Sequence, residues 1–378
     1  MLMKRGVFNH KNVRIRKKLQ GRTVEKLFFS VDQTQIAQRV KHILGLMRGP
    51  FFDGVFLFVP FLLCLGTYYV LVGRPGIWGL NIAVVILFYS AYISTGHAMS
   101  TFSRVVWDKD SLKKYHWLLA VTPIVMGFLL YQVVDWLGLV FLMTSYFYLQ
   151  WFHYVRQGYG LSQVYRHLNK INDPAWLHYS VIYGMALWGF AHRATTPDQV
   201  FLFQPMYTFP QLGWLEYPLA GFALATLAYW LIRRAVDFYN GRPVFGYTTF
   251  VLTHVAVFYL SLIYIQDPTI GWIGSAFWHG TQYIFFVWHF NKRQIESKGR
   301  TTNAFQWVAL SAFIFVPAFF YFGKFTYWAW TSIQVNMQFA ATTTIALNLA
   351  FLYNHYLADA ILWRKQKQRN EEVKSSNS

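Results

Sequence analysis

The chain has 378 residues, of which 55% are hydrophobic and 13% charged, and it carries a formal net charge of +19. Soluble domains carry about 25% charged residues, so this composition excludes an ordinary soluble domain and predicts an integral membrane protein. The single cysteine, Cys64, excludes disulfides, cysteine-ligated iron–sulfur clusters and cysteine-rich zinc sites within one chain.

A basic arm, residues 1–50, precedes the first apolar stretch. Near the end of this arm, Ile36, Val40 and Ile43 recur at helical spacing, with Arg39 and Lys41 between them. This pattern predicts an amphipathic helix that lies in the membrane interface.

Apolar stretches follow, each close to the length of about 20 residues that crosses a bilayer. They are predicted at approximately residues 51–73, 77–97, 116–135, 136–156, 176–193, 213–235, 244–265, 268–290, 304–323 and 332–362. Residues 51–364 are therefore expected to form one all-α, polytopic bundle of about ten transmembrane helices. Residues 194–212, the longest external loop, are expected to cover the outer face, and the polar tail at 365–378 is expected to be disordered.

The positive charges fall almost entirely on one side of these spans. When the connecting segments are assigned alternately to the two sides, 31 of the 34 lysines and arginines share the side of the termini, and only Arg74, Arg193 and Lys324 lie opposite. The positive-inside bias predicts that both termini are cytoplasmic, and the short loops favour a bacterial inner (plasma) membrane. Charges in such loops set topology and contact anionic membrane lipid, so no nucleic-acid partner is expected.

Polar side chains inside membrane spans are costly and usually face the bundle interior. On some of the predicted spans they line up along one helical face, at about 100° per residue. These stripes are Ser90, Ser94, His97, Thr101 and Arg104; Gln150, His153 and Gln157; His279, Gln282, His289 and Arg293; and Thr344, Asn348, His355 and Asp359. Each stripe contains a histidine, and neutral imidazole binds iron, copper and zinc. The stripes therefore predict a metal site inside the bundle.

The expected metal ligands share a place near the cytoplasmic ends of their spans. They are His97, His153, His289 and His355, with Asp359 one turn beyond His355. His279 lies about 15 Å from His289 along the same helix, so one ion cannot bind both. We therefore expect His279 to belong either to a second metal site or to a relay or substrate contact.

Other polar residues have expected roles around these ligands. Asp359 is the only carboxylate inside a span at this level, which makes it the expected general base, and Gln282 is expected to lie with His279 on the substrate side. The remaining groups are expected to orient the ligands or to contact the substrate: Gln150, Gln157, Asn348, Asn354, Arg104 and Tyr283.

These residues predict a metal-dependent membrane oxidoreductase of the oxygenase, desaturase or hydroxylase type. Iron, in a mononuclear or dinuclear site, is the first choice because histidine and carboxylate ligands with open positions suit oxygen activation, and copper or zinc accept the same ligands. Aromatic runs beside the stripes, such as residues 146–148, indicate a lipid or another hydrophobic small molecule as substrate. A redox reaction also implies an electron donor.

Two other functions fit the sequence. A b-type haem protein for electron transfer would use His254 and His279, which lie at similar depth, as axial ligands. A transporter would use the histidine, glutamine and asparagine side chains of the spans as a proton or solute path. The chain shows no internal repeat and few acidic residues inside spans, which disfavours a transporter. The HxxxH and HxxHH pairs of membrane di-iron enzymes are absent, so the enzyme hypothesis depends on where the histidines lie.

Overall fold

The structure, a computed structural model, describes residues 33–77, 80–106, 109–296 and 337–376. This part of the chain is mostly helical. Its α-helices are α2 (Gln33–Leu44), α3 (Pro50–Tyr68), α4 (Ile82–Phe88), α5 (Thr95–Val106), α6 (Lys109–Leu168), α7 (Ala175–Thr195), α8 (Glu216–Tyr239), α9 (Phe245–Tyr259), α10 (Pro268–Glu296) and α12 (Met337–Ser376). Wider π-helical turns continue several of them, namely η1 (Tyr69–Gly73), η3 (Tyr89–Ser94) and η5 (Leu260–Tyr264), and the 3-10 helix η4 (Pro210–Leu215) precedes α8.

Within these residues, 6 helices are long and apolar enough to cross a membrane. They run over Pro50–Gly73, Ile82–Phe102, Ser111–Leu168, Pro210–Tyr239, Phe245–Tyr264 and Thr342–Leu362. Helices α7 and α10 match the predicted spans at 176–193 and 268–290 in position but are not among the six. The predicted span at 304–323 lies outside the described residues. The structure is thus compatible with an all-α membrane protein, and the number of about ten spans stays a prediction.

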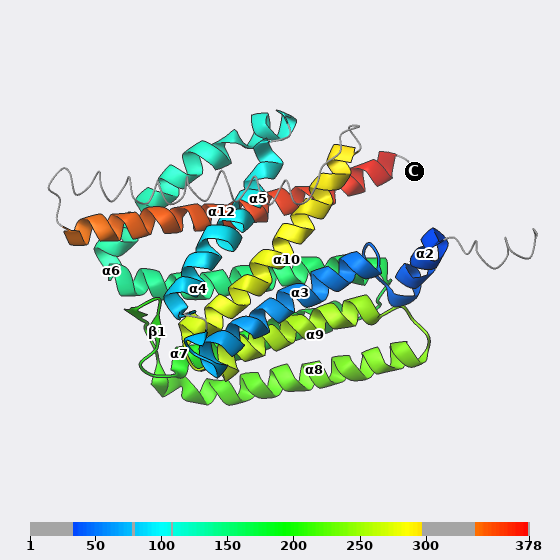
Figure 1. Ribbon diagram of the computed structural model, residues 1–378, viewed down its shortest axis with the longest axis horizontal. Coiled ribbons are helices and arrows are strands. Elements are labelled where there is room, and N and C mark those ends of the chain that lie inside the picture. Colours follow the sequence, from blue (N-terminus) through cyan, green and yellow to red (C-terminus); the bar gives the residue numbers. More distant parts are fainter. Residues whose placement is uncertain (1–32, 78–79, 107–108, 297–336, 377–378) are drawn as a thin grey trace, which may run out of the picture.

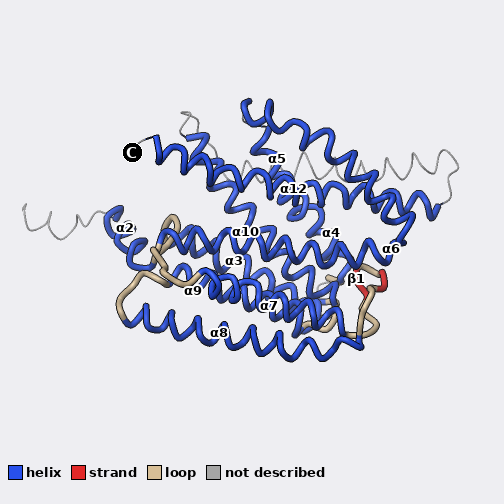
Figure 2. Tube along the Cα trace, turned by 180° about the vertical axis from the view of Figure 1, so that it is seen from behind, coloured by secondary structure: helices blue, strands red, loops and turns tan. Residues whose placement is uncertain are grey.

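The long helices lie side by side in an elongated bundle (Figures 1 and 2). Helix α12 packs along α6, α10 along α3, and α7 along α8 and α9. Figure 1 places α2 and the C-terminal end of α12 at one end of the bundle and β1 at the other. Both ends of the described chain lie at one end of the bundle, and the location of the termini relative to a membrane stays a prediction.

Helix α6 contains both spans that were predicted at 116–135 and 136–156. The two halves meet at Gly138, whose φ of 86° and ψ of 164° are not helical. Glycine reaches this region at little cost because it has no Cβ. The chain therefore changes direction there, and the two halves of α6 diverge (Figure 1).

The π-helical turn η3 lies between α4 and α5, within the predicted span at 77–97. A π-turn bonds residue i to i+5 instead of i+4 and so shifts the following residues around the helix axis. Ser90 and Ser94 lie in this turn, whereas His97 follows it in α5. The prediction that Ser90, Ser94 and His97 share one helical face assumed regular α-helical spacing and was therefore wrong for this segment, although the His97 side chain is still buried.

Two segments outside the predicted spans have regular structure, and the second of them differs from expectation. The loop at 194–212 contains the antiparallel hairpin of β1 (Val200–Phe201) and β2 (Gln204–Pro205), which packs against α6 and α10. The tail after Lys365 was expected to be disordered, and instead α12 continues to Ser376. Lysine, arginine, glutamine and glutamate are good helix formers, and a span that is already helical removes the cost of nucleation.

Close packing around α10 depends on glycine. The Tyr68 hydroxyl on α3 donates to the Gly271 carbonyl oxygen over 2.9 Å and lies 2.5 Å from the Ser261 hydroxyl of η5. A Cβ at Gly271 would lie 2.1 Å from the Ser261 carbonyl oxygen, and one at Gly274 would lie 2.2 Å from the Tyr68 ring. Small residues let helix backbones approach closely inside membranes, and here they hold α3, η5 and α10 together.

The Gly271→Ala substitution is expected to lower the free energy of unfolding by about 1–3 kcal/mol or more, because the added methyl group meets backbone and not a movable side chain. The thermal unfolding midpoint of the detergent-solubilised protein measures this effect. The matched control is Gly221→Ala on α8, where a Cβ meets nothing within 4 Å. Equal midpoints for the two variants would contradict the prediction.

Candidate metal centre

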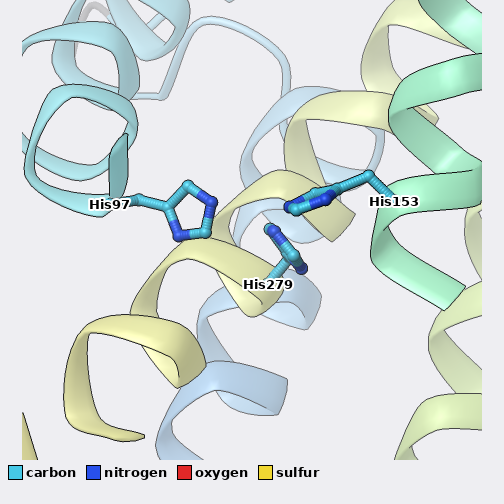
Figure 3. Close-up of side chains that lie close together, drawn as sticks. All are labelled: His97, His153 and His279. Carbon is cyan, nitrogen blue, oxygen red and sulfur yellow. The ribbon is translucent and has the colours of Figure 1, made fainter. Parts of the chain in front are cut away.

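Histidines from separate helices meet in the interior of the bundle. We call His97 (α5), His153 (α6), His279 (α10) and His355 (α12) the histidine cluster. All of them are buried. The ring of His97 lies at the centre, with ring centroids 4.4 Å from His355, 4.7 Å from His279 and 6.1 Å from His153. His153 completes the cluster at 5.1 Å from His279 and 5.2 Å from His355. Figure 3 shows three of these rings, those of His97, His153 and His279, pointing toward one another.

The spacing of the ligand atoms suits metal binding. One group comprises His97, His153 and His279, and a second comprises His153, His355 and Asp359. Within each group the candidate ligand atoms all lie within 4.8 Å of one another. Two nitrogens bound to one tetrahedral zinc lie about 3.4 Å apart, given bond lengths of about 2.0–2.1 Å. Small side-chain rotations therefore bring either group around one ion.

Each member of the histidine cluster has a buried ring nitrogen that finds no hydrogen-bond partner among the described residues. These atoms are Nδ1 of His97, Nε2 of His153, Nε2 of His279 and Nδ1 of His355. Buried polar atoms are almost always paired, because an unpaired one costs about 1–3 kcal/mol. A metal ion is a partner that could take ring nitrogens of several of these histidines as ligands at once.

The second group contains a carboxylate that is already oriented. The hydroxyl groups of Thr101 and Tyr283 donate to Oδ1 of Asp359 over 2.8 and 2.5 Å. The other oxygen, Oδ2, lies 3.8 Å from Nε2 of His355. The two donated hydrogen bonds fix the orientation of the carboxylate, with Oδ2 on the side of His355. Asp359 thus lies beside His355 in a group that could hold a metal ion, and its role as a ligand stays a prediction.

The rings of His97 and His355 face each other through Nε2, at 2.7 Å. Two neutral nitrogens at this distance require one of them to carry a proton and donate to the other. An ion bound through Nε2 of either ring would displace this hydrogen bond and its proton. Metal affinity at this site is therefore expected to depend on pH, as it does wherever ligands must lose protons.

His289 lies elsewhere, and this corrects the expected ligand set. Its Nδ1 is 3.4 Å from an Arg48 guanidinium nitrogen, and its ring centroid is 5.0 Å from that of Phe52 on α3. His279, which was expected at another depth, occupies the place in the cluster that was assigned to His289. The sequence-based choice of His289 assumed that histidines at equal distances from the ends of their helices lie at the same level of the bundle. Helix α10 crosses its neighbours obliquely (Figure 1), so this assumption does not hold for it.

The structure separates the predicted supporting residues. Tyr283 reaches Asp359, and the Gln150 side chain donates to the Tyr154 hydroxyl over 2.8 Å. Asn348 donates to the Thr344 carbonyl oxygen, and Asn354 donates to the Leu118 carbonyl oxygen and accepts a hydrogen bond from the Thr122 hydroxyl. The side chain of Gln157 and the amide nitrogen of Gln282 have no hydrogen-bond partner within the described residues. The side chain of Arg104 lies outside the described part. Of the predicted set, therefore, only Tyr283 has a described hydrogen bond to a candidate ligand.

Two residues next to the centre had no predicted role, namely Tyr154 and Tyr356. The Tyr154 ring stacks on His279 with centroids 3.9 Å apart, and the Tyr356 ring stacks on His153 at 4.2 Å. Each tyrosine directly follows a cluster histidine in the sequence. That repeated His-Tyr dipeptide is the signal that could have identified them.

The pair expected to bind haem does not have the geometry for it. Nε2 of His254 donates to the Ile182 carbonyl oxygen over 3.1 Å, so this nitrogen carries the proton. The opposite edge of the ring lies against Gly158, where a Cβ would meet Nδ1 at 2.5 Å. Neither nitrogen of His254 faces room for a macrocycle, while His279 turns toward the histidine cluster.

The comparisons with known proteins do not extend this picture: the chain matches no protein-family model, and no curated protein and no solved structure is significantly similar to it.

Proposed function

We propose that the chain is a metal-dependent integral membrane enzyme, an oxidoreductase of the oxygenase, desaturase or hydroxylase type. The observation that carries the proposal is the histidine cluster, in which candidate ligand atoms from four helices form two groups, each within 4.8 Å, and one group includes the Asp359 carboxylate. Buried ionisable groups inside a membrane bundle mark functional sites by default, because their burial is costly. A structural core in this position would be more stable with apolar side chains.

The chemistry of the donors favours iron. The cluster offers imidazole nitrogens and one carboxylate, a set that suits iron in oxygen chemistry and also accepts copper or zinc. Because His153 belongs to both groups of ligands, it would take part in holding an ion at either of them. Bound iron would supply oxygen activation, while the chain positions the ligands and excludes water.

The surroundings favour a hydrophobic substrate. Aromatic rings line the histidine cluster: Tyr154, Tyr283 and Tyr356 each contact a cluster histidine within 4.5 Å of ring centroids. Such walls suit a lipid or another hydrophobic small molecule that enters from the bilayer. The charge bias of the sequence supports a bacterial inner membrane with cytoplasmic termini, where a cytoplasmic electron donor has access to one face.

Metal analysis tests the proposal. The full-length protein, expressed in iron-supplemented medium and purified in detergent without chelator, is expected to contain iron at one or two ions per chain. The His279→Ala variant is expected to lower the metal affinity of the group formed with His97 and His153 by more than about 100-fold, the upper end of what changes around the ligands cost, and to leave the group of His153, His355 and Asp359 complete. The matched control is His289→Ala on the same helix, which is expected to retain the metal. Absence of iron, copper and zinc from the wild-type protein would contradict the proposal.

A further inference from the structure

Two His-Tyr dipeptides, on separate helices, lie at the proposed metal centre. In His153-Tyr154 on α6 and His355-Tyr356 on α12, the histidine joins the cluster. The tyrosine that follows each of them stacks on a cluster histidine of another helix. Tyr154 lies on His279 with an interplanar angle of 26°, and Tyr356 lies on His153 with an angle of 25°. Each helix thus supplies one ligand and one phenol ring that is in contact with a neighbouring ligand.

This contact gives the phenol rings a short electronic path to any ion held by the cluster. A phenol can release an electron and a proton together and leave a neutral radical, which few side chains do. Tyr154 is only 2% exposed, so water and soluble reductants have little access to a radical on its ring. The Gln150 amide donates to the Tyr154 oxygen over 2.8 Å, which fixes the position of the hydroxyl group whose O–H bond would break.

We propose that Tyr154 and Tyr356 are redox-active side chains that each supply one electron and one proton to an oxidant reacting at the metal centre, a role that depends on the function proposed above. For hydrogen peroxide as oxidant the step balances. The O–O bond of one peroxide molecule breaks, the O–H bond of each tyrosine breaks, and two water molecules and two neutral tyrosyl radicals form. An ion held by the histidine cluster would pass on the electrons from the two tyrosines and would be unchanged at the end of the step.

Further tyrosines continue from Tyr356 toward the hairpin end of the bundle. The ring centroid of Tyr353 lies 5.9 Å from that of Tyr356, and the buried ring of Tyr146 lies 6.2 Å beyond it. Tyr146 in turn contacts Phe201 of β1 at 6.0 Å. This row of aromatic rings offers a radical formed at Tyr356 a path away from the metal ligands.

Electron paramagnetic resonance tests the inference on the full-length protein. The protein is loaded with iron(II) without oxygen in detergent, mixed with hydrogen peroxide and frozen rapidly. We expect an organic radical signal whose hyperfine structure narrows when the protein is made with ring-deuterated tyrosine. In the double variant Tyr154→Phe/Tyr356→Phe, which keeps both stacked rings and therefore the bound iron, the signal is expected to fall to background. The control Tyr239→Phe, at a side chain that is 90% exposed, is expected to leave the signal unchanged.

The iron content of every sample is measured first, which separates this inference from the proposed function. Failure of the wild-type protein to bind metal overturns both. Iron-loaded wild-type protein without a deuterium-sensitive radical overturns the inference alone. An undiminished radical in the iron-loaded double variant also overturns it, because both rings would then serve only to position the histidines.

Discussion

The His153→Ala variant is expected to bind metal at neither group of ligands. His153 is the residue shared by the set that includes His97 and His279 and by the set that includes His355 and Asp359. Its removal leaves only two protein ligands in each set, fewer than the three that open catalytic metal sites usually have. The metal content per chain after loading with iron(II), followed by removal of free metal, measures the effect.

Single variants on either side of His153 separate the two sets. His97→Ala leaves the set of His153, His355 and Asp359 complete, and His355→Ala leaves the other set complete, so each is expected to retain one ion per chain. The control for folding and handling is His167→Ala, an exposed histidine on the same helix as His153. If His153→Ala bound as much metal as His97→Ala, the shared ligand and with it the geometry of the centre would be wrong.

The second large effect is expected at the start of the first span, where the Asp53→Ala substitution should lower the free energy of unfolding by about 2–6 kcal/mol. Asp53 is fully buried and accepts hydrogen bonds from the backbone N–H groups of Met47, Arg48 and Gly49, at 2.7–2.9 Å. It also accepts from the Tyr165 hydroxyl on α6, at 2.7 Å. Alanine leaves these donors without an acceptor, and the figure counts about 1–3 kcal/mol for each of the two most deeply buried ones.

Two comparisons make the Asp53 prediction specific. Asp53→Asn keeps one carbonyl oxygen in place and is expected to unfold at a temperature between those of the wild type and Asp53→Ala. Asp135→Ala, at an exposed position of α6, is expected to leave the thermal midpoint unchanged. A midpoint for Asp53→Ala equal to that of Asp135→Ala would show that the turn before α3 does not depend on this carboxylate.

Much of the helical layout follows from local patterns in the sequence. The predicted spans at 51–73 and 244–265 agree closely with the helices Pro50–Gly73 and Phe245–Tyr264, because a long apolar run bounded by polar residues determines both its type and its limits. The same local argument failed where the backbone departs from regular α-helix, as at the π-helical turn Tyr89–Ser94. There one wider turn changes which face the later residues occupy, and no pattern of polarity shows where it lies.

The candidate centre could be predicted only in part. A histidine inside an apolar span is visible in the sequence, and His97, His153 and His355 were expected to meet and do so in the structure. The exchange of His279 for His289 was not predictable, because it depends on the angles at which the helices cross. The stacked rings of Tyr154 and Tyr356 depend on the same angles, and each tyrosine by itself resembles many others in this aromatic chain.

By itself, the sequence determined that this protein is composed of apolar helices with polar stripes inside them, and that its charges lie mainly beside the ends of those helices. The free-energy cost of burying polar groups explains both features, because the polarity of a residue limits the environments it can occupy, however the helices are arranged. Only the tertiary structure decided which stripes converge. Contacts between helices that are distant in sequence depend on crossing angles, on glycine contacts such as Gly271 against Ser261, and on kinks such as Gly138, which act through packing over the whole bundle.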